Sequence, residues 1–183
     1  GESDIREAII RGHEQSQRQE SLRTRFTYRG NQAVQVIVDD LQLSSTITDI
    51  TGALVEQHRK IHQLSQEETL TPFDITRLPL LRVKLFRLAD DHFVMLTVFH
   101  HIIIDGWGLG VFFHELTSLY RAHISEMSVP LSPIKTQYAD FAEWQRDWLS
   151  GKRLQKQMDY WLRQLADLPT LNLIPDRPRT KAT

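Results

Sequence analysis

The residues best suited to chemistry lie together in one short stretch, His100-His101-Ile102-Ile103-Ile104-Asp105-Gly106. It follows the apolar run Phe93–Phe99, which is typical of a buried strand, and it precedes a helical pattern. If this stretch had only a structural role, one histidine would end the strand and Asp105 would cap the helix. Three polar groups beside Gly106, where a ligand could approach the backbone, favour a functional site.

The types and spacing of these residues favour acid–base chemistry. Adjacent residues at a strand end point to opposite faces, so His100 and His101 cannot easily converge on one metal ion, and no metal site is predicted. One imidazole can then act as a general base while the other supports the loop. The chain has no G-x-S-x-G sequence for a covalent acyl-enzyme. The run Gly106–Gly110 lacks the G-x-G-x-x-G spacing of dinucleotide-binding loops.

Composition indicates one ordinary globular domain, with 183 residues, 40% of them hydrophobic and 25% charged. The 22 Lys and Arg against 23 Asp and Glu give a net charge of −1, which predicts neither a nucleic-acid nor a membrane partner. No apolar run approaches the roughly 20 residues of a spanning helix. The absence of Cys fits a reducing compartment, so a cytoplasmic location is expected. The first residues lack the order of a signal peptide and suggest a domain excised from a longer chain.

The first half of the chain predicts helices and strands that would carry this stretch. A mostly solvated helix is expected from Ile5 to about Gln19, followed by a hairpin around Arg29-Gly30-Asn31. A second helix is expected over 48–66. Alternation from Leu81 and the apolar run Phe93–Phe99 predict two strands, of which the second would be central and buried.

The second half predicts three helices and a tail. The first helix begins near Gly106, and two more follow from helical stripes over 138–148 and 154–165. Three prolines within 168–183 predict an extended tail or linker.

Four ordered motifs resemble those of nonribosomal peptide synthetase condensation domains. The first is H-H-x-x-x-D-G followed by Trp107. Arg18–Phe26 resembles R-H-E-x-L-R-T-x-F, with Gln19 in place of the usual His. Tyr138–Gln145 resembles Y-x-D-F-A-x-W-Q, and Leu173–Arg179 resembles L-P-x-D-R-P-R. The opening motif of the family, S-x-A-Q-x-R-L-W, is missing.

The resemblance implies a fold and a place in a larger assembly. The fold is expected to be an α/β two-layer sandwich with a mixed β-sheet, that is, one chloramphenicol acetyltransferase-like lobe. Residues 1–183 would form the N-terminal lobe of a condensation domain, with 168–183 as an extended tail towards an absent C-terminal lobe. That lobe and a neighbouring adenylation domain are expected partners.

The resemblance also implies an activity. The amine of an acceptor aminoacyl thioester attacks a donor acyl or peptidyl thioester, and an amide forms. Both substrates would be held on 4'-phosphopantetheine arms of donor and acceptor carrier proteins, and no cofactor is expected to bind the chain directly. His101 would act as general base or would position the attacking amine.

Roles for the neighbouring residues follow from the same resemblance. Asp105 would pair with Arg18, or failing that with Arg23, and so hold the loop in shape. Removing one partner of such a buried pair would cost about 3–5 kcal/mol. Gly106 would permit close approach of the thioester and offer its N–H to the oxyanion.

The remaining residues singled out are expected to support the site. His100 and Trp107 would lie behind the reacting groups. Three aromatic residues match a family motif but share a core-like stripe, so packing is expected of them: Tyr138, Phe141 and Trp144.

Two alternatives remain open from sequence. One is a coenzyme A-dependent acyltransferase of the wider H-x-x-x-D superfamily, and the other is a condensation-like module that docks carrier proteins without catalysis. Within the condensation family, L-to-L, D-to-L and starter domains are not separated by this lobe.

Overall fold

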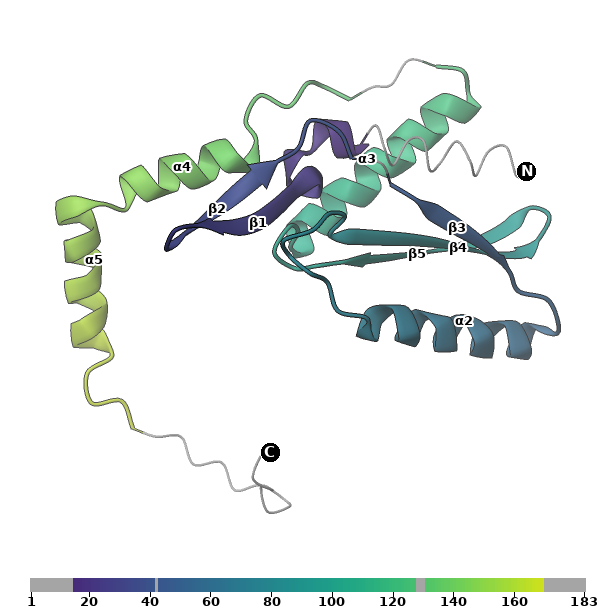
Figure 1. Cartoon of the computed structure of the whole chain (residues 1–183), viewed down its shortest axis with the longest axis horizontal. Coiled ribbons are helices and arrows are strands. Elements are labelled where there is room, and N and C mark those ends of the chain that lie inside the picture. Colours follow the sequence, from purple (N-terminus) through teal and green to yellow (C-terminus); the bar gives the residue numbers. More distant parts are fainter. Residues whose placement is uncertain (1–14, 42, 128–130, 170–183) are drawn as a thin grey trace. The chain divides into compact units, whose positions relative to one another are not determined.

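The computed structural model describes residues 15–41, 43–127 and 131–169 of the chain (Figure 1). Contacts divide the chain into two units, 1–141 and 142–183, and each is described by itself. The predicted helix from Ile5 lies mostly outside the described residues, and so does most of the predicted tail. Residues 15–18 are helical, but Gln15 and Ser16 are fully buried, so the expectation of a mostly solvated helix is wrong for this part.

The hairpin that opens the first unit agrees with the prediction. A 3-10 turn, η1 (Glu20–Arg23), leads into β1 (Thr24–Arg29), which pairs with β2 (Gln32–Ile37) as an antiparallel ladder. Gly30 adopts φ +59° at the turn, a conformation that glycine reaches without strain.

A second sheet of three strands contains both pairing directions. Strand β3 (Ser45–Asp49) runs parallel to β4 (Leu81–Ala89), and β4 pairs antiparallel with β5 (His92–Phe99). The helix α2 (Leu54–Leu70) connects the two parallel strands. The predicted α/β class with a mixed sheet is therefore confirmed.

Two details of this sheet differ from the prediction. The helix expected from residue 48 begins only at Leu54, because the β-branched run Thr46-Ile47-Thr48 belongs to β3. The expectation that the strand over 93–99 is central is also wrong. Strand β4 is central and has buried residues, whereas no residue of β5 is fully buried.

Helices pack on the two faces of the three-stranded sheet (Figure 1). Leu81 and Val83 of β4 contribute to the packing around α3 (Gly106–Ile124). Arg82, on the opposite face because side chains alternate along a strand, forms an ion pair with Glu68 of α2.

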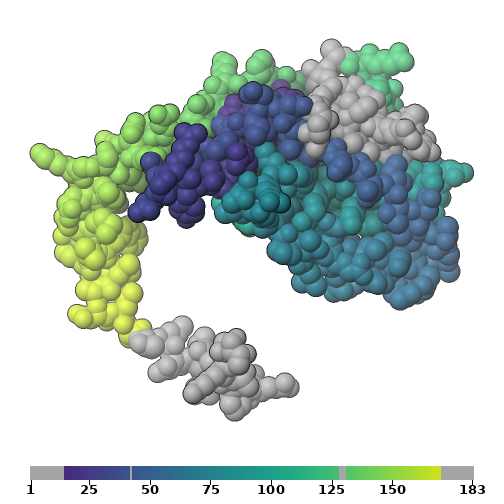
Figure 2. All heavy atoms as spheres, in the orientation of Figure 1, coloured from purple at the N-terminus to yellow at the C-terminus, as the bar shows by residue number. Residues whose placement is uncertain are grey.

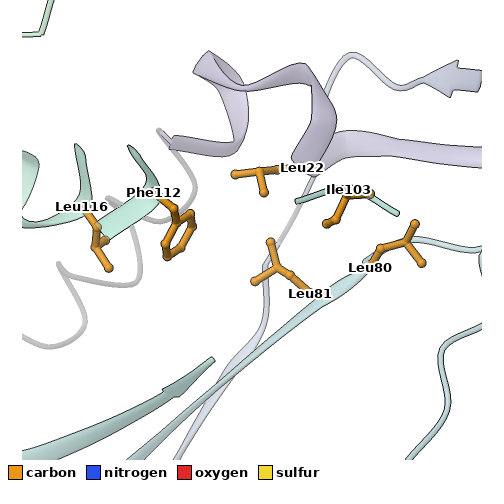
Figure 3. Close-up of a cluster of buried hydrophobic side chains, with 6 residues drawn as sticks. All are labelled: Leu22, Leu80, Leu81, Ile103, Phe112 and Leu116. Carbon is orange, nitrogen blue, oxygen red and sulfur yellow. The ribbon is translucent and has the colours of Figure 1, made fainter. Parts of the chain in front are cut away.

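The hydrophobic core of the first unit joins η1, the start of β4, the loop after β5 and α3 (Figure 3). Figure 2 shows the atoms of the hairpin in contact with those of the sheet region, and Phe26 N–H donates to the Ile75 carbonyl across this boundary. Each fully buried aliphatic or phenyl side chain stabilises the fold by about 1.5–3 kcal/mol. The buried members are Leu22, Leu80, Leu81, Ile103, Phe112 and Leu116.

The last two helices agree with the prediction in position but not in burial. Helix α4 (Tyr138–Trp148) crosses the boundary between the units, and α5 (Gly151–Gln164) belongs to the second. Neither helix has a buried residue among those described. The three motif aromatics are not buried in a core, since Tyr138, Phe141 and Trp144 are 64%, 40% and 55% exposed. Their rings pack instead on neighbours within α4, Tyr138 on Phe141 and Trp144 on Trp148.

Candidate active site

The loop between β5 and α3 carries the predicted site residues and is fixed to the core at several points. The backbone N–H of His100 donates to the Leu80 carbonyl at 2.9 Å, and Ile103 N–H donates to the His100 carbonyl at 3.1 Å. Ile103 itself is 7% exposed within the core cluster. Because the loop is bonded at its start and buried at its middle, the residue between these anchors has a defined position.

That residue, His101, is exposed and lines a cavity of about 490 Å³. Three segments distant in sequence form the cavity: η1 with the hairpin, the loop with the start of α3, and residues 136–141. Its walls combine polar groups with apolar ones. The polar side chains include Gln19, His101, Asp105 and Gln137, and the apolar ones include Leu22, Phe26, Ile37, Trp107, Val111 and Phe112.

The two histidines differ in their environment. His101 is exposed at the cavity, whereas His100 is half-buried and does not line it. The Nδ1 of His100 accepts the backbone N–H of Ile102 at 3.0 Å. Its ring also meets Phe73 edge to face, with centroids 6.1 Å apart.

Asp105 caps α3, and the expected pairing with an arginine is wrong in this structure. Its carboxylate accepts the backbone N–H of Gly108 at 2.8 Å, and the side chain is exposed. The short reach from residue 105 to the third residue of the helix favours this local bond. The capping alternative considered from sequence is the observed one.

Arg18 and Arg23 instead bind other groups. Arg18 donates to Glu115 Oε1 at 3.1 Å and to the Ser132 carbonyl at 2.9 Å. Arg23 donates to the Val38 carbonyl and forms an ion pair with Glu20. Arg18 therefore bonds to α3 and Arg23 to the end of the hairpin, and neither bonds to the carboxylate of the loop.

The glycines of α3 differ in how tightly they are packed. A Cβ added to Gly106 or Gly110 would have no neighbour within 4 Å, so close packing does not require glycine there. A Cβ on Gly108 would lie 3.0 Å from Ile104 Cγ1 and 3.3 Å from Asp105 Oδ1. Gly108, which is not among the site residues predicted from the sequence, is therefore the tightly enclosed glycine. Trp107 is 86% exposed and lines the cavity without supporting the loop from behind, contrary to expectation.

A polar network at the wall of the cavity contains residues that were not predicted from the sequence. Gln19 Nε2 donates to Glu115 Oε2 at 3.1 Å, beside the Arg18 bond to the same carboxylate. Gln137 Nε2 donates to the Arg18 carbonyl at 2.8 Å, and Gln137 Oε1 accepts Glu20 N–H at 3.2 Å. One signal was available in the sequence, because Glu115 is a charged residue inside an otherwise apolar helical stripe.

The pKa shifts resolved for described residues lie away from the cavity. The hydrogen bond from Arg87 lowers the pKa of Asp49, and the hydrogen bond from Arg59 lowers the pKa of Glu56. Thr76 lowers the pKa of Asp74 in the same way. Among the residues that the structure describes, no three His, Cys, Asp or Glu side chains gather as a metal centre requires.

The chain belongs to the condensation domain family. The family model described as "Condensation domain" matches residues 13–183. A linear gramicidin synthase of Brevibacillus parabrevis is 44% identical over 165 residues, which is 89% of this chain and 3% of that protein. Phosphinothricin tripeptide synthetase PhsC of Streptomyces viridochromogenes is 39% identical over 167 residues, which is 90% of this chain and 15% of that protein.

Solved structures share the fold. The SgcC5 protein of Streptomyces globisporus superposes with a TM-score of 0.76 at 28% identity, over 98% of this chain and 40% of that one. The X-domain from teicoplanin biosynthesis gives a TM-score of 0.78 at 28% identity, over 95% of this chain and 38% of that one. The chain thus spans about two fifths of these structures and a small part of the synthetases. Within the described residues, no helix has the length and apolar character to cross a membrane.

Proposed function

We propose that this chain supplies the catalytic loop for amide-bond formation in nonribosomal peptide synthesis. Membership of the condensation domain family supports this proposal, and so do relatives named as a gramicidin synthase and a tripeptide synthetase. The substrates would be an aminoacyl thioester as acceptor and an acyl or peptidyl thioester as donor.

The single observation that carries the proposal is the position of His101. Its imidazole is exposed at a cavity of about 490 Å³, while the backbone on either side of it is hydrogen bonded. Because the backbone is fixed, the basic side chain can contact each bound amine in the same orientation.

The reaction would proceed by direct attack. The amine nitrogen of the acceptor forms a bond with the thioester carbon, which gives a tetrahedral oxyanion, and the C–S bond then breaks. The imidazole of His101 accepts the ammonium proton and returns it to the leaving thiolate, so the products are an amide and a thiol. General-base assistance contributes typically 10²–10⁴-fold. Orientation of the reacting groups contributes up to about 7–11 kcal/mol.

The first turn of α3 would stabilise the oxyanion. Gly106 and Trp107 are the first two residues of this helix, and the first amides of a helix have no carbonyl partner within it. Asp105 already accepts the N–H of Gly108. Trp107 lines the cavity beside His101, whereas Gly106, the residue expected to make the oxyanion contact, does not. We therefore assign the oxyanion contact to the first turn of α3, at the positive end of the helix dipole, and not to the Gly106 N–H in particular.

The partners required by this chemistry are proteins. Donor and acceptor carrier proteins would each present a thioester on a 4'-phosphopantetheine arm, which enters as part of the substrate. The C-terminal lobe of the domain would complete the cavity, and an adenylation domain would load the acceptor. The apolar wall suits the acyl parts of the substrates, and the polar wall suits their amides.

The test follows acyl transfer between carriers by intact-protein mass spectrometry. A condensation domain with both lobes is mixed with donor-loaded and acceptor-loaded carriers, and the mass of the acceptor is recorded over time. The donor mass should appear on the acceptor, and His101→Ala should lower the rate by about 10²–10⁴-fold.

The matched control is His92→Ala, because His92 is an exposed histidine at the other end of β5. This variant should transfer at the wild-type rate. Equal rates for His101→Ala and wild type would refute the role of His101. Transfer from coenzyme A thioesters but not from carriers would instead identify an acyltransferase, and carrier binding without transfer would identify a docking module.

A further inference from the structure

We propose that Phe73 and Arg82 are positioning residues, which hold the His100 ring in one orientation and thereby fix the backbone of His101. The effect on turnover rests on the proposed function. The orientation of the ring does not, and it can be measured separately.

The His100 side chain closes a turn around His101. Ile102 N–H donates to His100 Nδ1 at 3.0 Å, and Ile103 N–H donates to the His100 carbonyl at 3.1 Å. A backbone N–H can only donate, so Nδ1 carries no proton and the neutral ring is protonated at Nε2. The turn that presents His101 therefore depends on both the rotamer and the tautomer of His100.

Phe73 restricts that rotamer. Its ring and the His100 imidazole lie 6.1 Å apart between centroids, with planes at 82°, which is an edge-to-face contact. Phe73 is half-buried and packs against the core cluster, so it offers His100 a stationary neighbour. Rotation of the imidazole away from Ile102 would lose this contact together with the hydrogen bond.

Arg82 in turn holds Phe73. The guanidinium carbon lies 3.8 Å from the centroid of the Phe73 ring, which is a cation–π contact. The same guanidinium donates to the carbonyls of Thr71 at 2.6 Å and Glu68 at 3.1 Å. These bonds leave the cation little freedom, because they attach it to the end of α2.

Glu68 completes the connection. Its carboxylate forms ion pairs with Arg82, at 2.7 Å, and with Lys84. The Glu68 side chain is only 11% exposed, so solvent screens these pairs weakly. Glu68 of α2 therefore contacts Arg82, Arg82 contacts Phe73, and Phe73 contacts His100. Glu68, Arg82 and Phe73 do not line the cavity, so they cannot contact a ligand there directly. The ring contact with His100 is the link from Phe73 to the turn that presents His101.

The first experiment reads the tautomer of His100 by NMR in the condensation domain with ¹⁵N-labelled histidine. At a pH where histidine is neutral, wild type should show His100 protonated at Nε2. Phe73→Leu and Arg82→Gln should give mixed tautomers and a broadened Ile102 amide signal, whereas Phe73→Tyr, which keeps the ring, should restore the wild-type spectrum. An unchanged His100 signal in both Phe73→Leu and Arg82→Gln would overturn the proposal.

The second experiment measures turnover of the same variants. Phe73→Leu should lower kcat by about 10- to 100-fold with little change in KM, because the base is misplaced rather than removed. The matched controls are Phe93→Leu, a half-buried ring at the far end of β5, and Arg87→Gln, which breaks the ion pair between Arg87 of β4 and Asp49 of β3. If the control variants show the same decrease in kcat as Phe73→Leu at an equal loss of stability, the effect of Phe73 is merely structural and the proposal is overturned.

Together the two experiments distinguish failure of the proposed function from failure of the positioning role. If wild type transfers no acyl group, the proposed function fails, and the NMR result still decides whether Phe73 and Arg82 orient His100. If wild type is active and the tautomer changes without loss of kcat, the positioning role fails and the function stands.

Discussion

Replacement of Asp105 by alanine separates the observed helix cap from the arginine pair expected from sequence. Asp105 is exposed, and its carboxylate makes one hydrogen bond of 2.8 Å to the N–H of Gly108. Loss of a cap costs about 0.5–2 kcal/mol, and loss of a negative charge at the N-terminus of a helix costs about 0.3–1 kcal/mol. The value for the cap already includes the charge of the same carboxylate, so Asp105→Ala should lower the free energy of unfolding by about 0.5–2 kcal/mol.

The assay is urea denaturation of wild type, Asp105→Ala and Asp105→Asn. Asparagine keeps an oxygen at the capping position and removes only the charge, so Asp105→Asn should lose no more than the charge contribution, about 0.3–1 kcal/mol. A buried pair with arginine would instead cost about 3–5 kcal/mol in either variant. A loss of that size, or equal losses in the two variants, would refute the cap as the role of Asp105.

Three further predictions concern stability. Gly108→Ala should destabilise the protein, since its Cβ would lie 3.0 Å from a side-chain carbon of Ile104, and thermal unfolding measures the loss. Glu115→Gln should cost about 1–3 kcal/mol in urea denaturation, because a carboxylate that is 9% exposed binds one guanidinium and one amide. Arg87 lowers the pKa of Asp49 by a hydrogen bond, so this contribution to stability is complete above the unfolded pKa of about 3.9 and is lost as the pH falls through the lower folded pKa. The difference between wild type and Asp49→Asn should accordingly shrink below about pH 4.

Each of these predictions has a control in the same unit. Gly110→Ala meets no neighbour within 4 Å and should stabilise α3 by about 1 kcal/mol, so destabilisation by both alanines would contradict the steric argument. Glu56→Gln breaks an exposed ion pair and should cost less than about 1 kcal/mol, and a loss equal to that of Glu115→Gln would contradict the argument from burial. For Asp49→Asn, a difference from wild type that is constant from pH 7 to pH 3 would contradict the assigned pKa.

The sequence predicted the elements that have a strong local signal. The hairpin at Gly30, the strands on either side of residues 90–91 and the start of α3 follow from turn residues and apolar periodicity, which act over a few positions. The short strand over 45–49 was missed, because five residues carry too little periodic pattern to separate them from the helix that follows. The apolar run in β5 indicated burial but could not reveal which strand is central, since that depends on pairing between distant segments.

In the candidate site, too, features with a local signal were predicted from the sequence, and features that depend on distant residues were not. The position of His101 after a strand followed from the order of strand, loop and helix. Alternation predicted that one of the two histidines faces a cavity, and the choice of His101 rested on the family resemblance. The partners of the arginines did not, because a long guanidinium side chain can reach several carboxylates and only the folded backbone selects among them. Arg18 binds Glu115, which is 97 residues away in sequence. The role of Gly108 depends on the side chain of Ile104, which a pattern of residue types does not place.

The polar network at the wall of the cavity has a consequence for folding kinetics. Gln137 bonds to residues 117 and 119 positions earlier in the chain, so each bond closes a very long loop. Closure entropy opposes such contacts until nearer ones have formed, whereas the β4–β5 ladder needs only a short turn. The network should therefore be absent from the folding transition state, and its loss would speed unfolding while leaving the folding rate nearly unchanged. On unfolding, these bonds at the wall of the cavity should accordingly break before the β4–β5 ladder separates.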